Sequence, residues 1–234
     1  MKIEGSKILI TGGSLGIGKA AARILVDGGA EVIITGRDAN RLKIASKETG
    51  AIPFVADVSR SEDVEKTYKF IRDSWGKLDV LVNNAGIGSK SSLLTEVSEE
   101  DFLNVYKVNV IGAAMMAKQA AIMFREQNYG NIINIASTAA RKGYERGTVY
   151  ASSKFALKGM TECWQAELRK YNVRVILINP SEVTTAFGNP ERIERKERNN
   201  RLRSEEIAHT IKASLEMDDR GFIPELTVFA TNPW

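Results

Sequence analysis

A cluster of glycines directly follows the first apolar run of the chain, and this feature constrains the fold most. Ile8-Leu9-Ile10 leads into Thr11-Gly12-Gly13-Ser14-Leu15-Gly16-Ile17-Gly18, and an alanine-rich helical pattern comes next. A diphosphate can rest on a helix N-terminus only where the backbone turns sharply and approaches closely, and side chains at the glycine positions would obstruct it. The segment predicts a strand, a phosphate-binding turn and a helix.

The spacing of these glycines leaves a second interpretation open. Gly-x3-Gly-x-Gly differs from the Gly-x-Gly-x-x-Gly of the commoner dinucleotide fingerprint, so the turn is also compatible with a tight strand-to-helix connection and nothing more. The strand before the turn and the helix after it favour the nucleotide site. A P-loop is disfavoured because the turn lacks the Gly-Lys-Ser/Thr ending.

Short β-branched runs alternate with helical patterns along the rest of the chain, which indicates βαβ units and a parallel sheet. The predicted strands are 8–11, 31–35, 52–55, 80–82, 132–135, 173–178 and 226–230, and the predicted helices lie near 17–28, 39–48, 61–75, 99–126, 148–170 and 204–216. Gly28 and Gly29 are expected to end the first helix. Ser61 and Ser98 are predicted N-caps, since acidic residues follow each of them.

This order predicts an α/β fold: a single-domain, Rossmann-type, doubly wound parallel sheet of about seven strands with helices on both faces. No repeat or Pro/Gly-rich linker divides the chain, so residues 1–234 are expected to form one domain. The irregular stretch from Pro180 to about Arg203 follows a strand at its carboxyl end. A long segment at that place usually covers a site.

Composition excludes several classes of function. The apolar runs are far shorter than the roughly 20 residues of a membrane span, and the first residues lack a secretory pattern, so we expect a cytoplasmic protein without membrane attachment. One cysteine, Cys163, and one histidine, His209, argue against a disulfide, a catalytic thiol and a transition-metal site. The net charge of +4 is too small to indicate nucleic-acid binding.

Arg37 follows the second strand, where an NAD site is expected to offer an acid to the ribose hydroxyls. A guanidinium there would pair with a 2′-phosphate, whereas a carboxylate would repel it. NADP(H) is therefore favoured over NAD(H), with Arg41 as a second, weaker candidate contact. The alternative is a solvated loop arginine.

Tyr150 and Lys154 lie four residues apart at the start of a helical pattern, so both project from one helix face. The ammonium is expected to lower the pKa of the phenol from about 10 by favouring the phenolate. Ser137 follows the strand 132–135 at the carboxyl edge, where a hydroxyl can hold a carbonyl group. Together these side chains predict a proton-transfer site.

In order and spacing these motifs resemble the short-chain dehydrogenase/reductase family over nearly the whole chain, in particular 3-oxoacyl-carrier-protein reductases and short-tailed NADP-dependent carbonyl reductases. The motifs that carry the resemblance are the glycine turn, Asp57, Asn83-Asn84-Ala85-Gly86, Asn109, Ser137, Tyr150-x3-Lys154 and the segment 180–185. The resemblance implies a homodimer or homotetramer that transfers hydride between nicotinamide and a carbonyl or secondary alcohol.

The resemblance also implies a role for each site residue. Tyr150 is the general acid or base, Ser137 stabilises the carbonyl or alkoxide, and Lys154 binds the nicotinamide ribose. Asn109 holds a water that supplies protons to Lys154. The cofactor-binding set is Gly12, Ser14, Leu15, Gly16, Ile17, Gly18, Arg37, Asp57, Val58, Asn83, Ala85, Gly86, Tyr150, Lys154, Pro180, Val183 and Thr185. Within it Asp57 and Val58 flank the adenine, Asn83 holds the adenosine ribose, and Val183 and Thr185 hold the carboxamide.

The chain departs from the family pattern at two of these places. Leu15 stands where many NADP-dependent members carry arginine or lysine, and Pro180-Ser181 replaces Pro-Gly. The segment 181–203 occupies the position of the family's substrate lid. The cations of its basic part, 192–203, predict docking of an acidic carrier protein such as an acyl-carrier protein, binding of an anionic substrate, or a solvated helix, with the helix favoured. A nucleotide-sensing or scaffold protein without catalysis is the alternative function.

Overall fold

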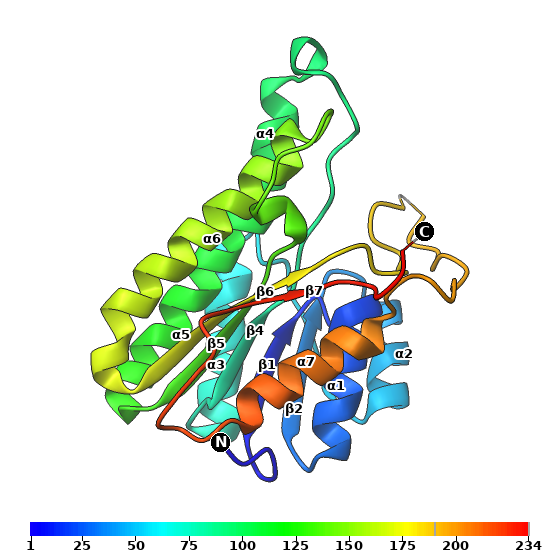
Figure 1. Cartoon of the computed structure of the whole chain (residues 1–234). Coiled ribbons are helices and arrows are strands. Elements are labelled where there is room, and N and C mark those ends of the chain that lie inside the picture. The colour runs from blue at the N-terminus through cyan, green and yellow to red at the C-terminus, as the bar shows by residue number, and fades with distance from the viewer. Residues whose placement is uncertain (190, 234) are drawn as a thin grey trace.

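Seven parallel strands form the centre of the molecule, in the order β3-β2-β1-β4-β5-β6-β7 (Figure 1). The computed structural model describes residues 1–189 and 191–233. The strands are β1 Lys7–Thr11, β2 Glu31–Gly36, β3 Ile52–Val55, β4 Val80–Asn83, β5 Gly130–Ile135, β6 Val173–Pro180 and β7 Glu225–Val228. Helices connect them: α1 Gly16–Asp27, α2 Ala39–Thr49, α3 Ser61–Trp75, α4 Glu99–Tyr106, α5 Ala113–Gln127, α6 Thr148–Leu168 and α7 Ser204–Glu216.

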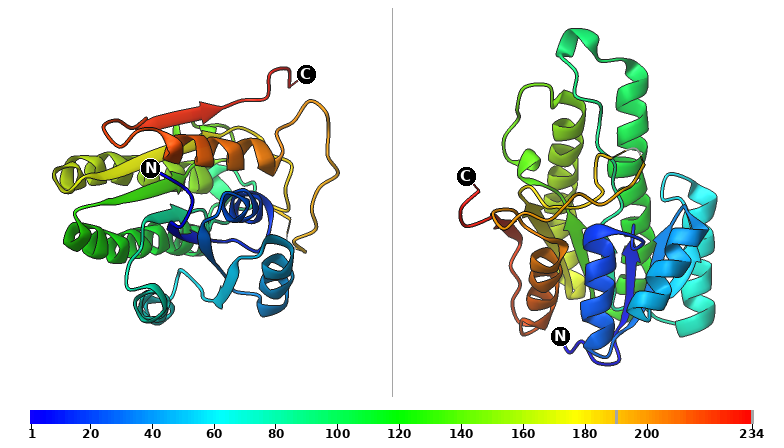
Figure 2. Two further views of the ribbon diagram at one scale, coloured as in Figure 1. Left: turned by 90° about the horizontal axis from the view of Figure 1, so that it is seen from below. Right: turned by 90° about the vertical axis from the view of Figure 1, so that its right-hand side faces the viewer.

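The central strands are apolar on both sides because helices cover both faces of the sheet. Ile8 and Ile10 of β1 pack with α1, α2 and α7, whereas Leu9 between them packs with α3 and α5. Figure 2 shows the two helical layers, with blue α1 and orange α7 on one side and green α5 and yellow-green α6 on the other. The doubly wound architecture predicted from the sequence is confirmed.

The direction of the strand order reverses between β1 and β4. From β1 the chain adds β2 and β3 on one side, then crosses over to add β4, β5, β6 and β7 on the other. The two connecting segments diverge at this point and leave a crevice outside the carboxyl ends of the strands, which is where open α/β sheets bind ligands.

The predicted helix over 99–126 is interrupted in its middle. Between α4 and α5 the residues Lys107–Gly112 form a π-helical turn. A Cβ at Gly112 would lie 2.9 Å from the Val58 carbonyl oxygen, so the backbone is in close contact with the loop after β3. The wider turn directs the carboxamide of Asn109 into the molecule, where it is 1% exposed.

The two predicted caps have different outcomes. Ser98 caps α4, accepting a hydrogen bond from the Asp101 backbone N–H at 3.2 Å. The prediction for Ser61 is wrong: Ser61 is already the first residue of α3, and Arg60 is the N-cap without a side-chain hydrogen bond. The Asp63 carboxylate in this first turn accepts from the Asp57 backbone N–H at 3.0 Å, which ties the helix to the loop after β3.

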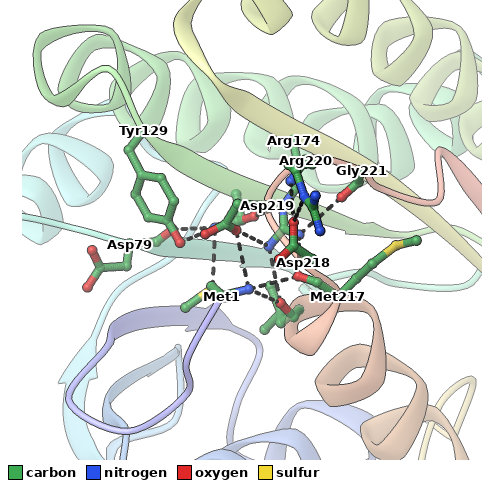
Figure 3. Close-up of polar contacts among 11 residues, drawn as sticks. Met1, Asp79, Tyr129, Arg174, Met217, Asp218, Asp219, Arg220 and Gly221 are labelled. Carbon is green, nitrogen blue, oxygen red and sulfur yellow. Dashed lines mark hydrogen bonds and ion pairs between the residues drawn. The ribbon is translucent and has the colours of Figure 1, made fainter.

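Arg174, at the amino end of β6, binds the carboxyl end of α7 to the sheet (Figure 3). Its guanidinium donates to the carbonyls of Leu215 and Met217 at 3.1 and 3.0 Å and lies 3.4 Å from Asp219. The α-ammonium of Met1 donates to the same two carbonyls. These contacts satisfy the last carbonyls of α7. The segment 181–203 is thereby held between two anchored elements, β6 and α7.

Among residues 1–189 and 191–233, no helix has both the length and the apolarity needed to cross a membrane.

Candidate active site

A cavity of about 490 Å³ lies at the carboxyl edge of the sheet, over the point where the strand order reverses. Its walls come from the segments that follow β1, β2, β3, β4, β5 and β6. The predicted site residues that line it are Gly12, Ser14, Leu15, Gly16, Ile17, Arg37, Asp57, Val58, Ala85, Gly86, Ser137, Tyr150, Lys154, Pro180, Val183 and Thr185. Residues scattered over the sequence therefore meet in one cavity.

The glycine turn has the geometry of a close-approach site. Gly12 and Gly16 have φ of +67° and +52°, conformations that other residues rarely adopt. A Cβ at Gly16 would lie 3.1 Å from the methyl carbon of Thr185, so this turn touches the segment after β6. Gly18 does not line the cavity: a Cβ there would lie 2.4 Å from the Gly12 carbonyl oxygen. Its role is to let α1 pack against the turn.

One end of the cavity is basic and contains an unpaired hydroxyl. Arg37 and Arg41 line it, and Arg37 Nη1 lies 3.9 Å from Asp57 Oδ2. Thr35 is one of the residues that line the cavity, and its buried hydroxyl has no hydrogen-bond partner among the described residues. A buried polar atom of this kind fits a bound polar ligand such as a nucleotide ribose.

Asn83, predicted to hold the adenosine ribose, is not among the residues that line the cavity. Its side chain is buried and donates at 3.1 Å to the carbonyl of Ala113 and to Oδ1 of Asn134, on the α5 side of the sheet. Asn84 faces the cavity instead, and it donates to the carbonyls of Thr11 and Gly12 at 3.0 and 3.1 Å. Side chains alternate along a strand, so the strand register decides which of the two asparagines faces the ligand.

Tyr150, Ser137 and Lys154 surround the other end of the cavity. Ser137 lies two residues after β5 and caps a short helical turn, and Tyr150 and Lys154 come from the first turns of α6. The amine of Lys154 is buried, donates to the Ile135 carbonyl at 3.0 Å and lies 5.7 Å from the centroid of the Tyr150 ring. The three predicted chemical groups are therefore brought together by two elements.

The predicted lowering of the Tyr150 pKa is contradicted by the structure. Burial raises the pKa of Tyr150 to about 12, with a hydrogen bond from Ser137 acting in the opposite direction and the neighbouring phenol of Tyr144 adding to the rise. Burial also lowers the pKa of Lys154 to about 8. The physical reason is desolvation: both groups leave water, and each neutral form is favoured. Tyr150 is a protonated phenol at neutral pH.

Asn109 lies beside this group and outside the cavity. Its carboxamide accepts from the Ile87 backbone N–H and donates to the Ile87 carbonyl, both at 2.9 Å, and donates to Ser153 at 3.1 Å. A Cβ at Gly86 would lie 3.4 Å from Asn109 Oδ1 and 3.6 Å from Lys154 Nζ. Asn109 thus fixes the segment after β4 next to the lysine.

The segment after β6 forms the roof of the cavity. Val183 and Thr185 line it, and the guanidinium of Arg195 donates to their carbonyls at 2.9 and 3.1 Å. The carboxylate of Glu182 forms ion pairs with the guanidinium groups of Arg195 and Arg201, with N···O distances of 3.2 and 3.3 Å. Much of the predicted basic surface is therefore used inside the segment itself, which weakens the docking interpretation. The favoured prediction of a solvated helix over 192–203 is wrong, because these residues form no helix and α7 begins only at Ser204.

Sequence reasoning missed the aromatic walls. The rings of Tyr150 and Phe187 lie 5.7 Å apart between centroids, and Tyr144 lines the same end of the cavity. Phe187 sits two residues after Thr185, which is the only signal that pointed to it. Within the described residues no cluster of His, Cys, Asp and Glu could hold a metal ion.

Replacing Lys154 with methionine is expected to stabilise the protein at pH 7 by about 2 kcal/mol. The full shift from 10.5 to about 8 corresponds to roughly 3 kcal/mol, and loss of the hydrogen bond to Ile135 offsets about 1 kcal/mol of it. The folded pKa lies below the unfolded one, so the destabilisation is complete below pH 8 and is lost as pH rises to 10.5. Urea unfolding between pH 7 and 10 measures this.

Lys158→Met is the matched control, because Lys158 lies one turn further along α6 and pairs with Glu225 at 2.9 Å on a more exposed face. It should show no stabilisation that fades with pH. A Lys154→Met variant that is less stable than wild type at pH 7, or a gain that persists unchanged to pH 10, would contradict the assignment of a buried charge.

Comparisons with known proteins agree with this arrangement. Residues 6–196 match the family described as short chain dehydrogenase. The chain is 33% identical over 190 residues to the 3-oxoacyl-acyl-carrier-protein reductase of Thermotoga maritima, covering 79% of this chain and 77% of the relative.

Solved structures with similar folds cover almost the entire chain. An alcohol dehydrogenase from Thermococcus sibiricus complexed with 5-hydroxy-NADP superposes with a TM-score of 0.87 at 28% identity, covering 97% of each chain. A 3-ketoacyl-acyl-carrier-protein reductase from Brucella melitensis complexed with NADH gives a TM-score of 0.89 at 27% identity, covering 99% of this chain and all of the other.

Proposed function

Because this chain belongs to the short-chain dehydrogenase family of oxidoreductases, we propose that it is an NADP(H)-dependent reductase of carbonyl groups, with Tyr150 as the proton donor. The observation that carries the proposal is the geometry at one end of the cavity, where the Tyr150 phenol lies with the buried Lys154 amine 5.7 Å from the centroid of its ring. The phenol is protonated at neutral pH, as a proton donor to a carbonyl must be. Ser137 and Lys154 line the same cavity.

When bound, the nicotinamide would supply the hydride. The protein groups bind and protonate the carbonyl oxygen of the substrate. The Ser137 hydroxyl donates to the carbonyl oxygen and holds it beside Tyr150, which gives its proton as negative charge develops there. Val183, Thr185 and Lys154, which line the cavity, would hold the cofactor there. Fixed donors that need no rearrangement supply most of the acceleration.

Asn109 does not contact the substrate and acts through Lys154. It fixes the Ile87 segment beside Lys154, and in the proposed relay a water held there returns a proton to Tyr150 through the lysine. A lysine with a pKa of about 8 both accepts and releases protons near neutral pH, which suits a relay.

The basic end of the cavity supports the choice of NADP(H). Arg37 and Arg41 both line it, and neither side chain is buried by the protein. Guanidinium groups bind phosphate through charge-assisted hydrogen bonds, whereas NAD(H) presents only hydroxyls at this position. Asp57 and Val58 then border the adenine.

The substrate end of the cavity supports an apolar ketone as substrate. Tyr144, Phe187, Ile87 and Ala186 line it together with Tyr150. Aromatic and aliphatic walls favour a substrate whose carbonyl is its main polar group. In this proposal the segment 181–203 is the substrate lid, since it carries Phe187 over the Tyr150 ring.

The test is a spectrophotometric assay of the purified protein with NADPH and a panel of small apolar ketones. We expect consumption of NADPH at the nicotinamide absorbance with at least one ketone, and slower consumption of NADH at equal concentration. Binding of NADPH without turnover on the whole panel would favour the alternative of a catalytically silent nucleotide-sensing or scaffold protein.

A second candidate is reduction of a 3-oxoacyl group carried by an acyl-carrier protein, which the name of the Thermotoga relative favours. The contacts of Arg195, Arg201 and Arg203 with Glu182 and Glu206 reduce the support for docking such a carrier on segment 192–203. Assay of a carrier-bound and a free 3-oxoacyl ester separates the candidates, because docking requires a much lower KM for the carrier-bound form.

We further propose a homodimer or homotetramer in the cytoplasm. Leu103, Ile111, Ile122 and Phe155 are exposed on α4, the π-helical turn, α5 and α6, and a second copy would cover them. Light scattering of the protein as it elutes from a size-exclusion column measures the mass of the assembly. A single species of 25.8 kDa, the mass of one chain, would refute the oligomer.

A further inference from the structure

Arg192 is the most enclosed residue at the start of the segment that roofs the cavity. It is half-buried, whereas Glu191 and residues 193–199 are exposed. It lines the same cavity as Arg37 and Arg41, although it lies more than 150 residues further along the chain. Its backbone has φ of +57°, a conformation that residues other than glycine adopt uncommonly.

Three positive charges therefore meet at one end of the cavity. Burial, together with the charges of Arg37 and Arg41, lowers the pKa of Arg192 below its ordinary value. Asp57 lies near Arg37 at 3.9 Å and Asp38 pairs with Arg41 at 2.8 Å. Within residues 1–189 and 191–233 Arg192 forms no ion pair with a carboxylate, so its guanidinium is available to an anion bound in the cavity.

The other cations of the segment are paired with carboxylates. Arg195 also lines the cavity, but it pairs with Glu182, as Arg201 does, and Arg203 pairs with Glu206. Glu194 and Glu197 line a separate groove with Lys19 and Arg23 of α1. Arg192 therefore differs from Arg195, the other cation of the segment that lines the cavity, in having no carboxylate partner among the described residues.

We infer that Arg192 is a third ligand of the cofactor 2′-phosphate and that this phosphate holds the segment 191–203 over the cavity. The inference rests on the proposed use of NADP(H). A dianionic phosphate among three guanidinium groups replaces repulsion by charge-assisted hydrogen bonds, whereas the 2′-hydroxyl of NAD(H) does not. Binding of the 2′-phosphate and ordering of the roof segment are then coupled, because Arg192 belongs to the roof segment and also contacts the phosphate.

Binding of adenosine 2′,5′-bisphosphate and 5′-AMP, measured by calorimetry, tests the contact without any turnover. The wild-type protein should prefer the bisphosphate. Arg192→Ala should weaken the bisphosphate about 10-fold or more and leave 5′-AMP unchanged, since one charge-assisted contact is lost. The matched control is Lys196→Ala, an exposed cation of the same segment outside the cavity, and it should change neither affinity.

Limited digestion with trypsin tests whether the 2′-phosphate holds the segment 191–203 against the cavity, because a held segment is cleaved more slowly. NADP+ should slow cleavage after Arg195 and Arg198 more than NAD+ does at equal saturation, and Arg192→Ala should abolish that difference.

The outcomes separate the inference from the proposed function. If Arg37→Ala loses the preference for the bisphosphate while Arg192→Ala keeps it, or if the two cofactors protect the segment equally, the role of Arg192 is overturned and the NADP(H) site stands. If the wild-type protein does not distinguish the bisphosphate from 5′-AMP, the choice of NADP(H) fails, and the inference fails with it.

Discussion

Replacing Tyr150 with phenylalanine is expected to lower the turnover number with NADPH and a ketone by ~10²–10⁴-fold, the usual contribution of general acid catalysis. The phenol is the protonated group in the cavity that Ser137 contacts, and phenylalanine keeps its ring against Phe187 while removing only the hydroxyl. Affinity for NADPH, measured by fluorescence titration, should change little because the ring and Lys154 remain. Steady-state kinetics give the turnover.

Tyr144→Phe is the matched control for this variant. Tyr144 is a second phenol on the cavity wall and is not seated beside Lys154. Its replacement should alter the KM for the ketone more than the turnover number. Near-normal turnover of Tyr150→Phe would refute its role as proton donor. An equal loss in both variants would instead indicate that the general polarity of the cavity matters.

Replacing Arg37 with aspartate is expected to lower the ratio of catalytic efficiencies, NADPH over NADH, by about 10²–10³-fold. The change removes a charge-assisted contact of about 1.5–3 kcal/mol and adds a repulsion of about 1 kcal/mol against the phosphate. The new carboxylate also stands close to Asp57, which lies 3.9 Å from the guanidinium in the wild-type protein. Efficiency with NADH should be retained or rise.

The control for cofactor choice is Arg60→Asp, which makes the same change of charge on the exposed arginine before α3, outside the cavity. It should leave the ratio of efficiencies within a factor of about two of wild type, since exposed charges at a distance are screened. An unchanged ratio in Arg37→Asp would remove this arginine from the phosphate site. A fall of the ratio in both variants would point to net charge as its cause.

The order of strands and helices was predictable from the sequence because the signals for it are local. Apolar runs such as Ile8-Leu9-Ile10 must be buried wherever they occur, and Gly28 and Gly29 end α1 in almost any context. The strand bounds accordingly differ from the predicted ones by a few residues. The prediction that Ser61 caps α3 was wrong by one residue. Contacts with the loop after β3 decide where that helix begins.

The site was predictable only in part. The residues that share a spacing motif, such as Tyr150 and Lys154, were found because four residues make one helical turn. Tyr144, Phe187 and Arg192 belong to no periodic element, and their place in the cavity depends on how two loops fold over it. No local pattern of residues contains that information.

By itself the sequence determined the doubly wound sheet, the phosphate turn at Gly12 and Gly16, and the elements that carry Ser137, Tyr150 and Lys154. Tertiary structure decided which asparagine faces the ligand, turned the expected lowering of the Tyr150 pKa into a rise, and placed Arg192 beside Arg37. The physical reason is range. Hydrophobic periodicity and glycine conformation act between neighbours in the chain, whereas desolvation and charge depend on every atom that packs around a group.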